Sequence, residues 1–196
     1  AAFTGWEAGW VPSAYERYDA THGLRQVTLG DGSQVELNLG TELVYSNYKD
    51  QRRVTLKKGE AFFNVSHDRA PPFIVQAGEG QVRVTGTQFN VWKYQDEVKV
   101  TLVEGSVLVS SDCNGGYHLG PGMQASYHQG DFDPHLAQSE DFDNALAWRG
   151  GKLVLDNLSL RQALPVSNRY LDKPLLLADD STARIRISGI YNTREV

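Results

Sequence analysis

The chain has 196 residues and a formal net charge of −5. This length allows one large domain or two small ones, and the charge excludes the basic footprint of a nucleic-acid-binding surface. The single cysteine, Cys113, excludes an internal disulfide and a four-cysteine metal site. The sequence also lacks the apolar run of about 18 residues that a membrane helix needs.

Charge is distributed unevenly along the chain. Residues 149–196 hold eight Lys or Arg and five Asp or Glu, while the remainder carries a net −8. This asymmetry indicates two modules.

Three echoes of one pattern run through the first module: "VTLGDGS" from Val27, "VTLKKGE" from Val54 and "VTLVEGS" from Val100. Val-Thr-Leu alternates with the period of a strand, and the glycine that follows fits a tight turn. Each echo therefore predicts strand, turn, strand. The same pattern recurs over residues 73–84 and more weakly over residues 119–123.

The echoes are spaced by 27 and 46 residues, so they do not form a strict solenoid. They predict an all-β domain of short strands and hairpins over residues 22–129, preceded by residues 1–21. Gly30-Asp31-Gly32 is assigned to turn chemistry and not to phosphate binding, because a strand and not a helix follows it.

Residues 130–149 predict an acidic linker. Asp and Glu crowd this stretch, and Arg149 is its first basic residue. A short helix is expected near Asp143 to Trp148, and Trp148 is expected to anchor it on a neighbouring surface.

Residues 150–196 predict a small α+β domain of order β-α-β-β. Strands are expected at 151–156, 175–177 and 184–188. A helix capped by Ser159 should lie between the first two, and Pro165 should kink or shorten it. So short a unit has little core and is expected to leave a strand edge free for a partner.

The ordered motifs resemble a known family. "RQVTLGDGSQVELN", "VTLKKGEAFFNVSHD", "PFIVQAG", "VRVTGTQFNV", "VTLVEGSV" and "LGPGMQASY" are similar to the periplasmic domain of FecR-type anti-sigma regulators, including siderophore-responsive PupR-like members. "WRGGKLVLDNLSLRQAL", "NRY" and "ISGIY" resemble the short N-terminal (STN) domain of secretins and TonB-dependent transporters.

The resemblance implies a periplasmic signalling region of a single-pass inner-membrane protein. A membrane helix would precede Ala1, so residues 1–21 would form a juxtamembrane segment. A last helix and strand would follow Val196. The partner would be the signalling domain of an outer-membrane TonB-dependent siderophore transporter, and no cofactor is implied. Contact would lead proteases to act on the parent and would release a sigma factor held by a cytoplasmic domain.

The candidate docking residues lie in the second module. An edge strand there can accept a partner strand, and arginines can contact an acidic partner. The alternative is that the aliphatic side chains form core and the arginines a solvated face. The candidates are Leu175, Leu176, Leu177, Arg184, Ile185, Arg186, Ile187, Ser188 and Tyr191.

Gly86-Thr87 in "VTGTQF" is the candidate for chemistry. The resemblance implies self-cleavage at this bond, in which the threonine hydroxyl attacks the preceding carbonyl to give an ester that water opens. The alternative is that Gly86 forms a bulge between two strands.

The sequence predicts no metal site and no turnover enzyme. The five histidines lack convergent ligand spacing, and Ser66-His67-Asp68 are adjacent residues that cannot converge as a catalytic triad. Trp6 and Trp10 fit either a membrane surface or packing on the β domain. The alternative function is a β-rich module that binds glycan or peptidoglycan through Tyr45, Tyr48, Trp92 and Tyr94.

Overall fold

The computed structural model describes residues 9–67, 71–111, 115–131, 133–139 and 142–193. The chain divides into two compact units, Ala1–Ser139 and Glu140–Val196. Each is considered by itself below. Trp6 lies outside the described residues, whereas Trp10 is 73% exposed.

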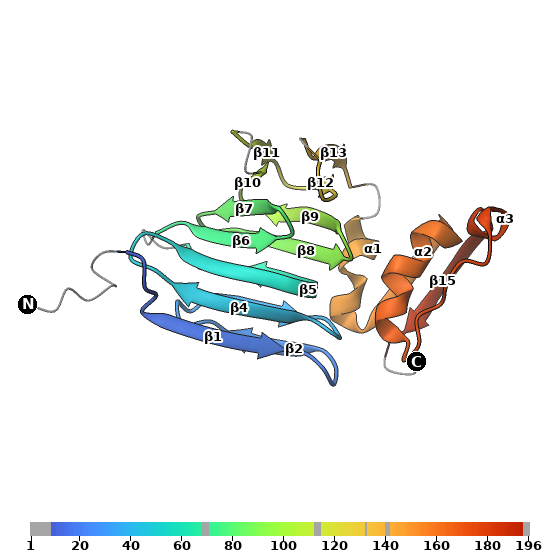
Figure 1. Cartoon of the computed structure of the whole chain (residues 1–196), viewed down its shortest axis with the longest axis horizontal. Helices are drawn as coiled ribbons and strands as arrows, with labels where there is room; N and C mark the ends of the chain where they lie inside the picture. The colour runs from blue at the N-terminus through green and yellow to red at the C-terminus, as the bar shows by residue number, and fades with distance from the viewer. Residues whose placement is uncertain (1–8, 68–70, 112–114, 132, 140–141, 194–196) are drawn as a thin grey trace, which may run out of the picture. The chain divides into compact units, whose positions relative to one another are not determined.

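The first unit is built on one curled sheet, which has 13 strands within the described residues (Figure 1). One half contains β1 (Ala14–Asp19), β4 (Glu42–Asn47), the start of β5 (Arg52–Asn64), β6 (Phe73–Ala77), β7 (Gly80–Val84), β10 (Val107–Ser111) and β11 (Tyr117–Leu119). The other half contains β2 (Arg25–Thr28), β3 (Gln34–Leu37), the end of β5, β8 (Gln88–Tyr94), β9 (Glu97–Glu104), β12 (Met123–Tyr127) and β13 (His135–Gln138). All pairs are antiparallel except β5 with β6.

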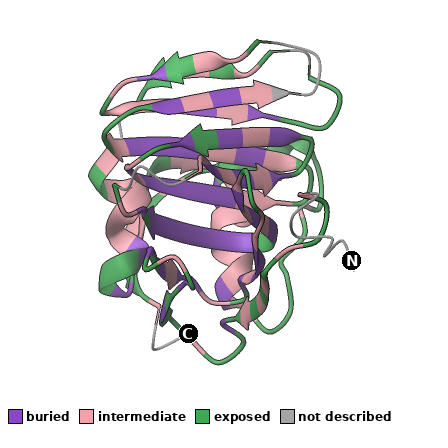
Figure 2. Cartoon of the chain, turned by 90° about the vertical axis from the view of Figure 1, so that its left-hand side faces the viewer, coloured by how far each residue is buried: buried purple, intermediate pink, exposed green. Residues whose placement is uncertain are grey.

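The core lies between the two halves because alternate residues of each strand point inward. Burial is nearly continuous along the central strands (Figure 2). Phe63 stacks on Phe89 at 5.0 Å and meets the edge of Phe73 at 6.2 Å, so three strands from both halves share one aromatic centre.

The three echoes have three different structures. The first is a hairpin, with β2 pairing β3 around Asp31-Gly32. The second is not a turn: Lys58 and Gly59 lie inside the 13-residue strand β5, where its pairing passes from one half of the sheet to the other. The third joins β9 to β10, which belong to different halves.

Gly59 lies where β5 passes from one half of the sheet to the other, and the packing at this point requires a glycine. Its φ is +100°, and a Cβ there would lie 2.4 Å from the Cα of Thr41. No side chain fits this approach, so the glycine serves a close packing of backbones and not a hairpin.

Two segments differ from their expected roles. Strand β1 lies within residues 1–21, which were expected to precede the β domain. Strand β13 lies within the expected acidic linker and pairs with β12.

The second unit is a small α+β arrangement, and the mainly β fold class predicted for the chain is confirmed. Its elements are α1 (Phe142–Leu146), η1 (Ala147–Gly150), β14 (Lys152–Ser159), α2 (Leu160–Ser167), η2 (Asn168–Tyr170), α3 (Asp180–Ala183) and β15 (Arg186–Asn192). Strands β14 and β15 pair antiparallel, and the predicted strand at Leu175–Leu177 does not form. The Asn168 side chain holds the Leu175 N–H and carbonyl instead, at 2.9 and 3.0 Å.

Helix α2 begins as the sequence predicts. Ser159 and Gln162 form a reciprocal capping box at its start. Pro165 lies inside the helix, which ends at Ser167, and the three residues that follow form the 3₁₀ turn η2. Trp148, expected as an anchor, is buried.

Candidate functional site

Two segments that carry the chain between the halves of the sheet lie side by side in the first unit. Residues 85–87 join β7 to β8, and residues 105–106 join β9 to β10. A Cβ at Gly105 would lie 2.9 Å from the Gly86 carbonyl oxygen and 3.0 Å from Thr87 Oγ1. The glycine of the third echo therefore allows this contact. The crossover site is defined here as Val65–His67, Gly86–Thr87 and Gly105–Ser106.

Thr87 is hydrogen-bonded through both its side chain and its backbone within the crossover site. It is 4% exposed, its Oγ1 donates to the Ser106 carbonyl at 3.1 Å, and its carbonyl accepts from Val65 N at 3.0 Å. Gly86 is not a bulge within one ladder, because it lies in the connection between two halves of the sheet. The connection that contains the Gly86–Thr87 bond is therefore held by hydrogen bonds from Thr87 to two other segments, at Val65 and at Ser106.

His67 packs against Gly86. A Cβ at residue 86 would lie 2.2 Å from His67 Nδ1 and 2.8 Å from its Cβ and Cγ. Sequence reasoning treated His67 as structural because it looked only at neighbouring residues. No local pattern links positions 67 and 86, and only the strand pairing brings them together.

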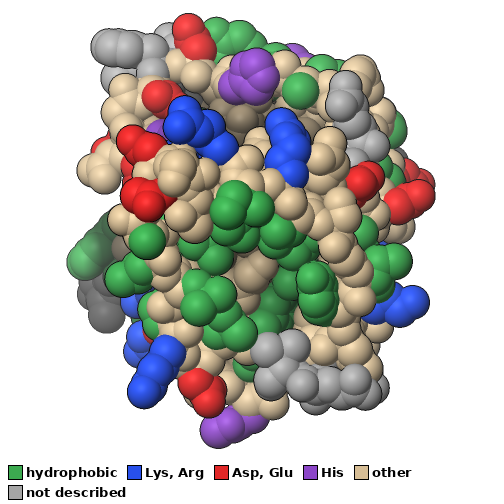
Figure 3. All heavy atoms as spheres, turned by 90° about the vertical axis from the view of Figure 1, so that its right-hand side faces the viewer, with side chains coloured by type: hydrophobic (Ala, Val, Ile, Leu, Met, Phe, Trp, Pro, Cys, Tyr) green, Lys and Arg blue, Asp and Glu red, His purple; other side chains and the backbone are tan. Residues whose placement is uncertain are grey.

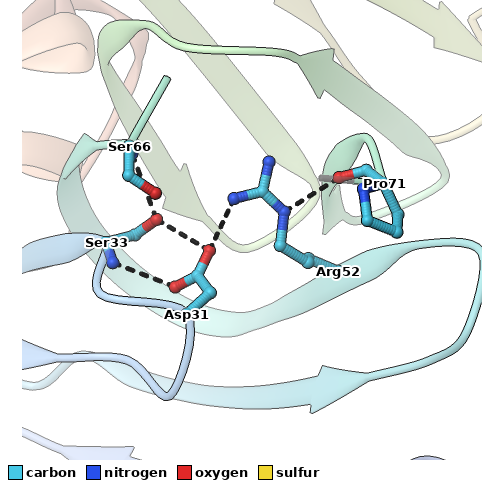
Figure 4. Close-up of polar contacts among 5 residues, drawn as sticks. All are labelled: Asp31, Ser33, Arg52, Ser66 and Pro71. Carbon is cyan, nitrogen blue, oxygen red and sulfur yellow. Dashed lines mark hydrogen bonds and ion pairs between the residues drawn. The ribbon is translucent and has the colours of Figure 1, made fainter. Parts of the chain in front are cut away.

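A buried polar network anchors the loop that carries His67 (Figure 4). Ser33 Oγ accepts from Ser66 N at 3.3 Å, and Arg52 Nε donates to the Pro71 carbonyl at 2.9 Å. Arg52 Nη1 also donates to Asp31 Oδ2 at 2.8 Å, and Ser33 Oγ donates to the same oxygen at 2.8 Å. Both described ends of the loop thus depend on one ion pair.

Arg52 is unusual for a charged residue. It is 2% exposed, its guanidinium lies 5.4 Å from the Phe73 ring centre, and Nη2 is buried without a hydrogen bond. Burial of a charge this deep requires its partner, so Asp31 and Arg52 act together.

The second unit exposes five large apolar side chains, and the name docking face is used here for this set: Leu175, Leu176, Ile185, Ile190 and Tyr191. Their exposed fractions run from 46% for Tyr191 to 87% for Leu176. Figure 3, seen from the side of α2 and β15, shows hydrophobic side chains gathered with Lys and Arg beside them. Among the described residues, β15 has β14 as its one strand partner, so its other edge carries no ladder.

The nine sequence-predicted docking residues divide by exposure. Leu177 and Ile187 are half-buried, whereas the other seven are exposed. Arg186 donates to the Asn157 carbonyl, at the bulge of β14. Ile190, which sequence reasoning missed, is 72% exposed and lies opposite Val154.

The aromatic residues proposed for glycan binding do not form an exposed platform. Tyr45 is fully buried and Trp92 is 6% exposed, and both belong to the sheet of the first unit. Tyr48 and Tyr94 are half-buried. The expectation of exposed aromatics fails for two of the four because their side chains point into packed layers.

The described residues hold no group of three or more His, Cys, Asp or Glu placed to bind a metal ion. Within the same part of the chain, no helix has the length and apolar character to cross a membrane.

Comparison with protein families gives one match: residues 18–108 match the family described as FecR protein. A search of curated proteins found no match. Two crystal structures of a candidate anti-sigma factor from Parabacteroides distasonis are similar to this chain, each at 28% sequence identity. The TM-scores are 0.77 for the 1.65 Å structure and 0.73 for the 2.50 Å structure.

The structural likeness extends well beyond the segment matched by the family. The two comparisons cover 91% and 92% of this chain and 85% of the other. The two comparisons agree with each other: residues 18–108 resemble the FecR family, and the fold of most of the chain resembles that of the candidate anti-sigma factor.

Proposed function

We propose that this chain is the periplasmic signalling region of a single-pass inner-membrane regulator. It binds the signalling domain of an outer-membrane TonB-dependent siderophore transporter. Binding leads to regulated proteolysis of the parent and to release of a sigma factor. The second unit serves as the STN-like receiver of this signal.

The docking face is the observation that carries this proposal. Five large apolar side chains of the second unit are exposed, and two of them lie on β15, whose outer edge has no ladder among the described residues. Exposed apolar side chains beside a free strand edge favour a partner that adds a strand and covers the face. Arg184, which is exposed next to Ile185, adds a positive charge that fits an acidic partner.

Titration calorimetry with a purified transporter signalling domain tests the proposal. The double variant Leu176→Ser/Ile190→Ser should weaken binding at least tenfold, because both side chains leave a desolvated interface. Leu24→Ser is the matched control, since Leu24 is an exposed leucine of the first unit. No heat and no co-elution with wild-type protein, both partners being folded, would contradict the proposal.

The crossover site favours a second, single-turnover activity: self-cleavage at Gly86–Thr87. The Thr87 hydroxyl donates its hydrogen to the Ser106 carbonyl. The lone pairs of Thr87 Oγ1 therefore remain free to attack the Gly86 carbonyl carbon. Purified protein should give two fragments in place of one 21.8 kDa species. Thr87→Ser should still cleave and Thr87→Ala should not, whereas an intact wild-type mass over days would contradict the activity.

A further inference from the structure

We propose that His67 carries the proton in cleavage of the Gly86–Thr87 bond. This inference rests on the self-cleavage proposed above and names the residue that assists it. Its basis is the fold itself, which brings together residues that are 19 positions apart in the sequence.

The His67 ring occupies the space that a side chain at residue 86 would fill. Of the ring atoms, Nδ1 lies nearest that point, at 2.2 Å. His67 is an exposed residue, so solvent reaches its side chain. An imidazole that contacts the residue before the threonine is well placed for general acid–base catalysis at that bond.

The position of His67 is set on both sides. Val65 N donates to Thr87 O at 3.0 Å, which ties the start of the loop to the residue that follows the bond that breaks. Ser33 and Arg52 hold Ser66 and Pro71 on either side of His67. These contacts keep the imidazole next to Gly86.

In the proposed step, the Thr87 hydroxyl turns away from the Ser106 carbonyl, with which it is hydrogen-bonded at rest. Its Oγ1 then adds to the Gly86 carbonyl carbon, and the imidazole accepts the hydroxyl proton. The carbon–nitrogen bond breaks, and the imidazole returns the proton to the departing nitrogen, which becomes the free amine of Thr87. Water then adds to the Gly86–Thr87 ester, whose carbon–oxygen bond breaks to give the Gly86 carboxylate, a proton and the Thr87 hydroxyl.

Rates of fragment formation in His67→Ala and His67→Phe test the role. Both should cleave at least about 100-fold more slowly than wild type, the lower end of what acid–base catalysis contributes. Added imidazole should restore cleavage in His67→Ala, where the ring leaves an open space, but not in His67→Phe, where a ring without nitrogen fills it.

The outcomes separate the two proposals. An uncut wild type overturns self-cleavage, and this inference with it. A wild type that cuts while His67→Ala cuts equally fast overturns the role of His67 alone. Slow cutting that imidazole does not rescue, with a lowered melting temperature, makes His67 a packing residue and also overturns the role.

Discussion

At the scale of single residues, the Asp31–Arg52 pair is the most constrained feature of the first unit. Both side chains are almost fully buried, and the guanidinium also holds a loop carbonyl. A carboxylate left alone in such a place must either be desolvated without a partner or take up a proton. The pair is therefore important to the fold mainly because removal of either side chain leaves the other buried without a partner.

Arg52→Ala should lower the free energy of unfolding by about 3–5 kcal/mol, because it leaves Asp31 buried without its cation. Arg17→Ala is the control: Arg17 pairs with Glu42 on the surface, where its side chain is 59% exposed, and solvent screening should make its loss far less costly than that of Arg52. Urea unfolding of the two variants checks the contrast. An equal loss of unfolding free energy in the two variants would contradict the importance of the buried ion pair.

Gly59→Ala should destabilise the first unit by about 2–5 kcal/mol, because it combines an unfavourable positive φ with overlap on the Thr41 backbone. Gly32→Ala shares the positive φ but meets nothing within 4 Å, so it should cost roughly 1–2 kcal/mol. Thermal unfolding of both variants measures the difference. A loss of stability in Gly59→Ala no larger than that in Gly32→Ala would mean that the backbone at Thr41 moves away from residue 59 at little cost.

Residue-level prediction from the sequence succeeded where chemistry is local and failed where it depends on the fold. Asp31-Gly32 was identified as a turn because its signals are adjacent in the chain. Arg52 went unnoticed and His67 was assigned a structural role, since an arginine beside Arg53 and a histidine in a loop look like ordinary surface residues. Their importance comes from Asp31 and Gly86, which strand pairing brings to them.

At the scale of elements, the strands show how one short pattern can serve three purposes. Val-Thr-Leu forms strand wherever it occurs, because alternation of apolar and polar residues fits a half-buried sheet. The glycine after it does not specify a hairpin by itself. Gly32 lies in a hairpin, whereas Gly59 and Gly105 lie where the chain passes between the halves of the sheet.

The strand predicted at Leu175–Leu177 fails for a reason that lies outside that segment. Three leucines in a row match a buried strand, but Leu176 is the most exposed large apolar residue described in the structure. The Asn168 amide satisfies the Leu175 backbone in place of a strand partner. The sequence gives no sign of this contact across seven residues.

Ser159→Ala should cost about 1 kcal/mol, because it removes the hydroxyl that accepts from Gln162 N at the start of α2. The second bond of the capping box, from Ser159 N to Gln162 Oε1, belongs to the backbone and remains. Ser167 ends the same helix and makes no capping hydrogen bond, so Ser167→Ala is the control. Circular dichroism melts of the two variants test this. A loss from Ser167→Ala as large as that from Ser159→Ala would contradict the role of the cap.

Helix α3 should loosen in acid. The Thr182 N–H and the Ser181 and Thr182 contacts lower the pKa of Asp179 from 3.8 to about 2. A lowered pKa means that this carboxylate stabilises the folded state above pH 4 and that its contribution disappears as the pH falls from about 4 to about 2. Amide exchange at Thr182 should rise in that window, and in Asp179→Asn it should lack this pH dependence.

At the scale of the whole molecule, the two units divide the proposed work. The first unit has an extensive core and a rigid crossover site, whereas the second pairs two strands and leaves large apolar side chains exposed. A unit with so little buried area gains more from a partner than one with a complete core. This contrast is why we place docking on the second unit.

The sequence predicted the general architecture at this scale better than its details. Period-two alternation and glycine turns predicted a mainly β chain, and a capped helix between strands predicted a small α+β part. The curling of one sheet around β5 was not predictable, because it depends on a strand that pairs with different neighbours at its two ends.

Amide hydrogen exchange with and without the transporter signalling domain tests the central claim most directly. We expect the transporter domain to slow amide exchange along β15 and over Leu175 to Leu177, and to leave exchange in β1 to β13 unchanged. Protection confined to the first unit, with β15 exchanging as in the free protein, would contradict it.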